Sequence, residues 1–405
     1  MNCVWEQRPL SAVCRVDKRQ GQYVGLPYVG LEDIESGTGR FIGSHAPIEV
    51  KSTTFRFTAS HVLYGRLRPY LNKIYRPDFD GHCSTEIFPL LPAATLDRNF
   101  LFYWLLQSST VSAIDATSTG ARMPRANMDA VMEFMLPVPP IPEQRRIVAI
   151  LDEAFEAIAA AKANTEKNLS NAREVFESQR ETMLSGSRTG WHDCLLQDLC
   201  DIKHGYAFEG EFFATAGQFV LLTPGNFFET GGYRDRREKQ KFFVGEIPKE
   251  FVLPEGALLV AMTEQAAGLL GSPLLVPEPN RFLHNQRLGL VSAKARTAWD
   301  NAFFFHVFNL RRVRNEIHRT ASGVKVRHTS PGKIGAVRVT YPEQVEVQRN
   351  IATRLSEVED ESHSLIDLLT RKLSALDELK QSLLHQAFTG ALTAKFTDKQ
   401  VAEVA

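Results

Sequence analysis

Two long stretches of the chain carry apolar residues at steps of three and four, with charged and amide residues at the positions between them. The stretches run from Pro142 to Gly186 and from Glu346 to Gly390. This spacing places the apolar side chains along one stripe of a helix, as in coiled coils. Neither stretch contains an internal Pro or Gly that would break a helix. We therefore predict two amphipathic helices, each roughly 65 Å long at 1.5 Å per residue.

The two stretches also share residues in one ungapped frame. Gln144 aligns with Gln348 and Arg145 with Arg349, and identities continue through Leu151 and Leu355 to the terminal glycines. Unrelated amphipathic helices share apolar spacing but rarely this many polar positions, so the pattern indicates an internal duplication. A long helix with a single apolar stripe needs a partner. The simplest partner is the other copy; the alternatives are the helix's own domain or a second chain.

The segments that precede the two helices show the same order of predicted elements. In the first half, strands are expected at YVGLEDI, VLYGRLRPYLNKIY and STEIFPLLP, then a helix from Asn99 capped by Asp97 or Asn99 itself, then STGARMPRANMDAV and MEFMLPVPPIP. In the second half, the corresponding segments are FVLLTPGNF, GALLVAMTEQAAGLLGSPLLV, HNQRLGLVSA, NAFFFHVFNLRRVRNEI and ASGVKVRHTSPGKIGAVRVTYPE. The loops differ and identity is low. The chain is therefore predicted to be an α+β protein with two mixed α/β domains and two long helices.

Composition narrows the class of protein. A chain of 405 residues with 43% hydrophobic residues can form two or three packed domains. The N-terminal sequence lacks a signal-peptide core and no segment approaches eighteen apolar residues, so we expect a cytoplasmic protein without a membrane span. The five cysteines form no CxxC pair and are expected to be reduced thiols. The net charge of zero means that any nucleic-acid binding depends on local patches or partner subunits.

With this order established, the chain resembles the DNA-specificity subunits of type I restriction-modification systems. The resemblance rests on VLYGRLRPYLNK, GHCSTEIFPL, STGARMPRAN and LPVPPIPEQRRIVAILDE in the first half, and on HNQRLGLV, ASGVKVRHTS and LLHQAFTGAL in the second. It implies target-recognition domains at 1–141 and 187–342, spacer helices at 142–186 and 343–390 that pair antiparallel, and a tail at 391–405. It also implies double-stranded DNA as ligand, two methyltransferase subunits docked on the helices, and restriction/translocase subunits that complete the enzyme. The chain lacks a long helical segment before the first domain, which leaves closure of the fold by its termini open.

Candidate DNA-binding residues in the first half lie in two segments flanked by Gly and Pro. Base reading needs donors and acceptors that reach groove edges, and phosphate binding needs cations or backbone amides. The segments YGRLRPY and TGARMPRAN supply Arg66, Arg68, Arg122, Arg125 and Asn127. The alternative for each arginine is a solvated side chain or an ion pair within the domain.

Candidates in the second half follow from aligning Gly323 with Gly120, which sets Lys325 opposite Arg122. The full set is Thr263, Gln265, Gln286, Arg287, Lys325, Arg327 and His328. Gln286 and Arg287 have a second interpretation, as residues that buttress the fold. The separate basic run YRDRREKQK contains acidic residues as well and is most simply a solvated face.

The sequence offers no recognisable catalytic, metal or cofactor site. It has no NPPY-type methyltransferase motif, no GxxxxGK[ST] phosphate loop and no HExxH, and SGTGRFIG is better explained as a turn. His61, His82 and Cys83 lack metal-ligand spacing. We expect a non-catalytic specificity subunit. The two competing classes are a coiled-coil adaptor without DNA specificity and an enzyme with an unrecognised site.

Overall fold

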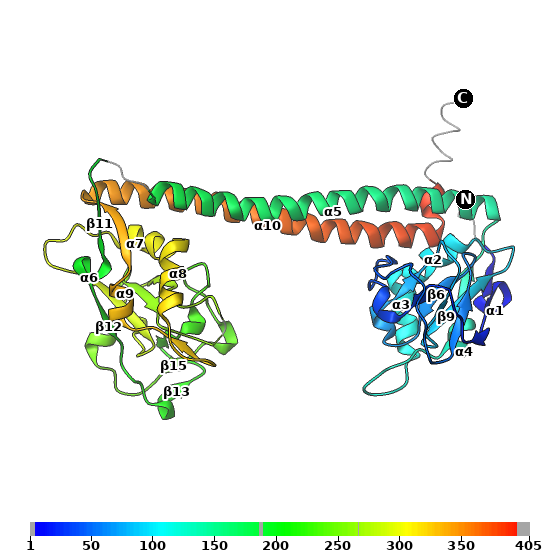
Figure 1. Cartoon of the computed structure of the whole chain (residues 1–405), viewed down its shortest axis with the longest axis horizontal. Helices are drawn as coiled ribbons and strands as arrows, with labels where there is room; N and C mark the ends of the chain where they lie inside the picture. Colours follow the sequence, from blue (N-terminus) through cyan, green and yellow to red (C-terminus); the bar gives the residue numbers. More distant parts are fainter. Residues whose placement is uncertain (1–4, 186–188, 266, 395–405) are drawn as a thin grey trace. The chain divides into compact units, whose positions relative to one another are not determined.

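The computed structural model describes residues 5–185, 189–265 and 267–394, which form two compact units (Figure 1). One unit contains Met1–Lys167 and Leu369–Ala405, and the other contains Asn168–Leu368. Each unit consists of a β-rich head and a paired segment of the two long helices, α5 (Ile141–Leu184) and α10 (Val345–Thr389). Of the predicted C-terminal tail, residues 391–394 form a helical turn after the break at Gly390, and 395–405 lie outside the described residues.

The first head is built from two four-stranded sheets and a two-stranded ribbon. One sheet has the order β2 (Cys14–Val16), β9 (Ile87–Pro92), β6 (Val62–Gly65), β7 (Ile74–Tyr75). The other has the order β3 (Gln20–Gly21), β5 (Thr54–Phe57), β8 (Gly81–Cys83), β4 (Tyr28–Val29). The ribbon pairs β1 (Gln7–Pro9) with β10 (Met135–Pro137). The helices are α1 (Leu10–Val13), α2 (Arg98–Leu106), α3 (Ser108–Ala116), α4 (Met128–Met132), and the 3-10 turns η1 (Leu31–Asp33) and η2 (Pro69–Leu71).

The second head repeats this arrangement. Its sheets have the orders β12 (Cys200–His204), β20 (Leu288–Ala293), β16 (Leu258–Ala261), β18 (Pro273–Leu275), and β13 (Phe213–Ala214), β15 (Phe242–Phe243), β14 (Phe219–Leu221), β19 (Phe282–Leu283). Two ribbons pair β11 (Trp191–Leu195) with β22 (Arg338–Pro342) and β17 (Thr263–Glu264) with β21 (Arg327–His328). The helices are α6 (Leu196–Leu199), α7 (Asn301–Phe308), α8 (Arg311–Thr320), α9 (Pro331–Gly335), and the 3-10 turns η3 (Gly210–Phe212), η4 (Pro224–Asn226), η5 (Arg237–Lys239) and η6 (Lys249–Phe251).

The two heads share their strand connections, including one parallel pair in each. β4 runs parallel to β8, and β14 runs parallel to β19. The other neighbour of the strand β8 is β5. On the equivalent strand of the second head, β19, this neighbour is reduced to a single antiparallel bridge between Val252 and Leu283. Where β15 pairs with β14 in the second, the first has a bridge between Pro27 and Pro47. The duplication predicted from the helices therefore extends to the topology of the heads.

The long helices cover each other's apolar stripe in an antiparallel sense. In the first unit, Lys380 lies over the ring of Phe155 at 5.2 Å, and Lys162 pairs with Asp377 at 2.8 Å. In the second unit, the Ser362 hydroxyl donates to the carbonyl of Ala172 at 3.3 Å. Residue numbers rise along α5 as they fall along α10 in these pairs. The predicted partnership between the two copies is confirmed.

Each helix predicted before the basic loops is in fact two helices. The chain leaves the helical conformation at Gln107, between α2 and α3, and at Leu310, between α7 and α8. All side chains from Phe100 to Leu106 are buried, whereas α3 buries only Thr110 and Ile114. A fully enclosed helix cannot continue as a surface helix without a change of direction, which the apolar spacing alone did not reveal. The predicted cap is confirmed, because Asp97 accepts the amide hydrogens of Asn99 and Phe100.

Candidate nucleic-acid interface

Three separate segments of the first head meet at the end of β6. The Arg66 amide donates to the Glu86 carbonyl at 2.9 Å, and the Ala126 amide donates to the Arg66 carbonyl at 2.9 Å. The Arg68 amide donates to the Pro124 carbonyl at 2.7 Å. The strand end, the turn before β9 and the basic loop 118–127 are therefore joined through the backbone. The two predicted segments, YGRLRPY and TGARMPRAN, form one surface.

Glu86 binds two of the predicted arginines on this surface. Its carboxylate accepts from Arg66 Nε at 3.0 Å and from Arg125 Nε and Nη2 at 2.9–3.1 Å. Burial opposes ionisation of Glu86, but the hydrogen bonds and charges of Arg125 and Arg66 outweigh it and lower the pKa of the carboxyl. The same hydrogen bond raises the pKa of Arg125. The expected alternative of an intradomain ion pair therefore holds for these two arginines, while both remain partly exposed.

The remaining candidates of the first head lie on the same face. Arg68 and Arg122 are exposed, and no side-chain partner is found for either among the described residues. Asn127 has a structural function, because its Oδ1 caps α4 by accepting from the Ala130 amide. Gly120, at φ 99°, adopts a backbone conformation that favours glycine and turns the loop at its start.

The second head repeats this frame with different side chains. The Met262 amide donates to the Arg287 carbonyl at 3.1 Å, and the Thr329 amide donates to the Met262 carbonyl at 3.0 Å. Gly323 has φ 100°, matching Gly120. In this frame Met262 and Arg287 take the places of Arg66 and Glu86. His328 takes the place of Arg125, as the predicted alignment required.

A cleft of about 660 Å³ opens beside this frame in the second head. Four predicted residues line it: Thr263, Gln265, Gln286 and Arg287. Three cations of the stretch 234–241 line it as well: Arg234, Arg236 and Lys241. Arg234 lies over the ring of Phe228 at 5.2 Å, and Lys241 lies over Phe213 at 5.3 Å. The cleft thus combines cations, amide and hydroxyl groups, and aromatic side chains, which are the groups that bind nucleic acid.

A buried carboxylate at the edge of the cleft fixes its wall. Glu264 accepts hydrogen bonds from the amides of Gly268, Leu269 and Leu270 at 2.8–3.0 Å. Arg327 donates to the other oxygen of this carboxylate at 3.2 Å. Arg327 is therefore engaged inside the domain. Lys325 and His328 of the same loop are exposed, with Val324 between Gly323 and Lys325 at 99% exposure.

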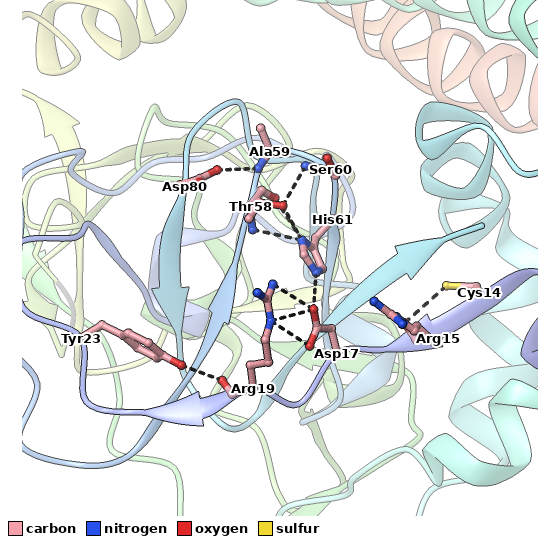
Figure 2. A network of polar contacts seen from close by, with 10 residues as sticks. All are labelled: Cys14, Arg15, Asp17, Arg19, Tyr23, Thr58, Ala59, Ser60, His61 and Asp80. Atoms are coloured by element: carbon pink, nitrogen blue, oxygen red, sulfur yellow. Dashed lines mark hydrogen bonds and ion pairs between the residues drawn. The ribbon is translucent and has the colours of Figure 1, made fainter. Parts of the chain in front are cut away.

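The histidines considered as metal ligands are buried and hydrogen-bonded within the first head. Figure 2 shows His61 between the Thr58 turn and the carboxylate of Asp17. The Thr58 amide donates to Nδ1 at 3.0 Å, so the ring proton lies on Nε2 and points to Asp17 at 3.2 Å. Burial opposes ionisation of Asp17, yet hydrogen bonds from His61 and Arg19 lower the pKa of its carboxyl. His82 bonds the Thr54 hydroxyl through Nδ1 at 2.9 Å.

Several residues of these surfaces were missed by the sequence patterns. Glu86 and Glu264 are acidic residues among basic ones, and only the folded chain shows which cations they bind. The stretch 234–241, interpreted as a solvated face, contributes Arg234, Arg236 and Lys241 to the cleft. Its repeated cations and neighbouring aromatic residues were the available signal.

Comparisons with known proteins agree with this architecture. Residues 17–169 match the family described as "Type I restriction modification DNA specificity domain". This match covers most of the first head and most of α5, so this part of the chain is similar to the DNA specificity domain of type I restriction-modification systems.

Two relatives carry the resemblance in sequence. The specificity subunit of the type I restriction enzyme EcoDI of Escherichia coli is 31% identical over 171 residues, or 42% of this chain and 37% of that subunit. The chain thus spans little more than a third of that relative in the match. The MjaVIII specificity subunit of Methanocaldococcus jannaschii is 21% identical over 320 residues, covering 74% of this chain and 71% of that subunit.

Solved structures carry the resemblance in fold. A chain from a structure of complex assembly and conformational transition of the type I R-M system aligns with a TM-score of 0.79 at 19% identity, covering 96% of this chain and 98% of that one. The HsdS subunit of Thermoanaerobacter tengcongensis aligns with a TM-score of 0.62 at 19% identity, covering 96% and 97%. No helix in the described part of the chain is long and apolar enough to cross a bilayer.

Proposed function

We propose that the chain is the non-catalytic subunit that gives a type I restriction-modification complex its DNA sequence specificity, each head reading one half of a split site. The observation that carries the proposal is the repeated frame at the ends of β6 and β16. Equivalent backbone hydrogen bonds in the two heads present different side chains, so one architecture serves two different base sequences. Direct readout depends on such side chains, whereas backbone geometry sets their position.

The paired helices α5 and α10 set the spacing between half-sites and dock two methyltransferase subunits in this proposal. Several large apolar side chains of these helices are exposed, which supports protein contacts there: Val175, Leu365, Leu368 and Leu379. Restriction/translocase subunits join the complex through the methyltransferase core. The zero net charge fits this division, because most of the phosphate neutralisation then falls to the partners.

Selection of bound fragments from a random duplex pool tests the proposal. The full chain is assembled with its methyltransferase subunit, and bound duplexes are sequenced after several rounds. The expected result is a pair of short defined sequences separated by a gap of fixed length. Bound fragments with no common sequence would instead support the adaptor alternative, in which the helices join partner proteins and the heads do not read DNA.

A further inference from the structure

The guanidinium of Arg66 is held from two sides. Its Nε donates to Glu86 at 3.0 Å, and its central carbon lies 5.1 Å from the centre of the Phe88 ring. Among the described residues, neither terminal nitrogen of Arg66 has a hydrogen-bond partner. The side chain is 33% exposed. The guanidinium of Arg66 is thus held in one orientation, while its two terminal nitrogens, which form the fork, are free to bind a ligand.

Arg125 differs from Arg66 in how much of its guanidinium is used. Both its Nε and its Nη2 donate to Glu86, and its Nη1 faces the Met123 carbonyl at 3.4 Å. The carboxylate therefore occupies the edge of Arg125 that would approach a base. Arg125 serves to hold Glu86 in place. Of the two arginines bound to Glu86, Arg66 is the one whose terminal nitrogens stay free among the described residues.

We propose that Arg66 reads a guanine in the half-site bound by the first head and that Glu86 is the residue that positions it. This inference rests on the proposed function. Two terminal N–H groups of one guanidinium match the O6 and N7 acceptors of guanine in the major groove. A guanidinium that is already oriented loses less conformational entropy on binding than a free side chain does.

The second head supplies an internal comparison. Met262 stands at the position of Arg66, Arg287 at that of Glu86, and His328 at that of Arg125. This position of the second head therefore has neither an oriented guanidinium nor a carboxylate to hold it. The arrangement that orients Arg66 is therefore found in the first head and not at the equivalent position of the second, so different groups read the two half-sites.

Binding of the full chain, assembled with its methyltransferase subunit, to a set of duplexes tests the inference. Each duplex carries one base-pair change in the selected sequence. For Arg66→Ala, discrimination at one G·C pair is expected to fall roughly 5- to 150-fold, with other positions unchanged. Glu86→Gln is expected to weaken discrimination at that same pair, and Arg66→Ala with Glu86→Gln to be no worse than Arg66→Ala alone. Glu35→Gln, which removes the exposed partner of Arg40 in the same head, is the matched control.

The outcomes separate this inference from the proposed function. If the wild-type complex shows no sequence preference, the proposed function itself fails. If it shows one and Arg66→Ala keeps the full preference, or loses affinity equally for every duplex, Arg66 is not a base reader and the inference is wrong. A first half-site without a G·C pair also contradicts it. Unchanged thermal unfolding of the variants ensures that a loss of discrimination is not a loss of fold.

Discussion

Gln144 and Gln348 make the same three buried hydrogen bonds in the two halves of the chain. Gln144 accepts from the Asp97 amide at 2.7 Å and donates to the carbonyls of Thr95 and Pro139 at 2.9 and 2.7 Å. Gln348 accepts from the Asp300 amide at 2.8 Å and donates to the carbonyls of Ala298 and Pro342 at 3.1 and 2.9 Å. Both side chains are fully buried. Each glutamine therefore joins the first turn of its long helix to the N-cap residue of a helix in the head. That residue is Asp97 of α2 in the first head and Asp300 of α7 in the second.

Replacing either glutamine should destabilise the unit that contains it. Gln144→Ala or Gln348→Ala leaves one amide and two carbonyls without partners, and we expect the free energy of unfolding to fall by about 2–4 kcal/mol. Urea denaturation measures the change. Gln179→Ala, at an exposed position of α5, is the matched control and should change stability by less than about 0.5 kcal/mol. Equal effects of the buried and exposed substitutions would rule out the joining function.

Apolar residues of the long helices should contribute unequally to the free energy of unfolding, according to how deeply each is buried. Leu355 is fully buried in the same cluster as Leu184, whereas Leu379 is 46% exposed. Leu355→Ala should lower the free energy of unfolding by about 2–5 kcal/mol. Leu379→Ala should cost less than about 1 kcal/mol and serves as the control. A small loss at Leu355 in denaturant titrations would contradict the pairing of the two copies in the second unit.

The exposed cations of the two loops should bind phosphates. Arg122→Ala and Lys325→Ala are each expected to weaken DNA binding equally for all sequences and to reduce the slope of log affinity against log salt by about 1. The two effects should add. Titrations at several salt concentrations give the slope. Arg319→Ala, which removes an exposed arginine paired with Glu316 on α8, should leave the slope unchanged; an unchanged slope for Arg122→Ala would exclude the phosphate contact.

The amide side chains of the cleft should read bases of the second half-site. Gln265 and Gln286 are both exposed in the cleft, and a glutamine can pair with adenine through its amide. For Gln286→Ala we expect a loss of about 1–3 kcal/mol in discrimination at one base pair of the second half-site. The first half-site should be unaffected. A uniform loss over both half-sites would show that Gln286 supports the fold instead.

Acid should lower the stability of the second head through its buried residue His284. Burial lowers the pKa of His284 to about 4, while its Nε2 donates to the Leu288 carbonyl at 3.0 Å. An unfolded chain binds this proton near pH 6.5, so the stability contribution is complete above that pH and is lost as the pH falls toward 4. The loss from this residue is at most about 3 kcal/mol. Urea titrations from pH 7.5 to roughly pH 4.5 would measure it.

His284→Gln provides the specific comparison for this pH dependence. Gln can keep a donor near the Leu288 carbonyl but takes up no proton in this range, so the variant should lose less stability on acidification. His385→Gln, at an exposed position of α10, is the control. A wild-type protein whose stability rises between pH 6.5 and 4.5 would contradict the argument.

The sequence predicted the repeated parts of the fold better than the surfaces. Polar identities such as Gln144 with Gln348 revealed the duplication, because a buried hydrogen-bonding function restricts a position more than apolar packing does. The breaks at Gln107 and Leu310 were not predicted, because apolar periodicity does not report a change of direction between two helices. The role of Glu86 was not predicted because its two arginine partners are 20 and 39 residues away in the sequence. The cleft is assembled from several separate segments, which no local pattern reveals.

Sequencing of methylated bases in a host that carries the system tests the central claim most directly. The wild-type chain should produce methylation at one split sequence, with both halves required. Arg66→Ala should relax only the half read by the first head, and Gln286→Ala only the other half. A methylation pattern that is the same with and without this chain, or variants that alter both halves together, would contradict the account.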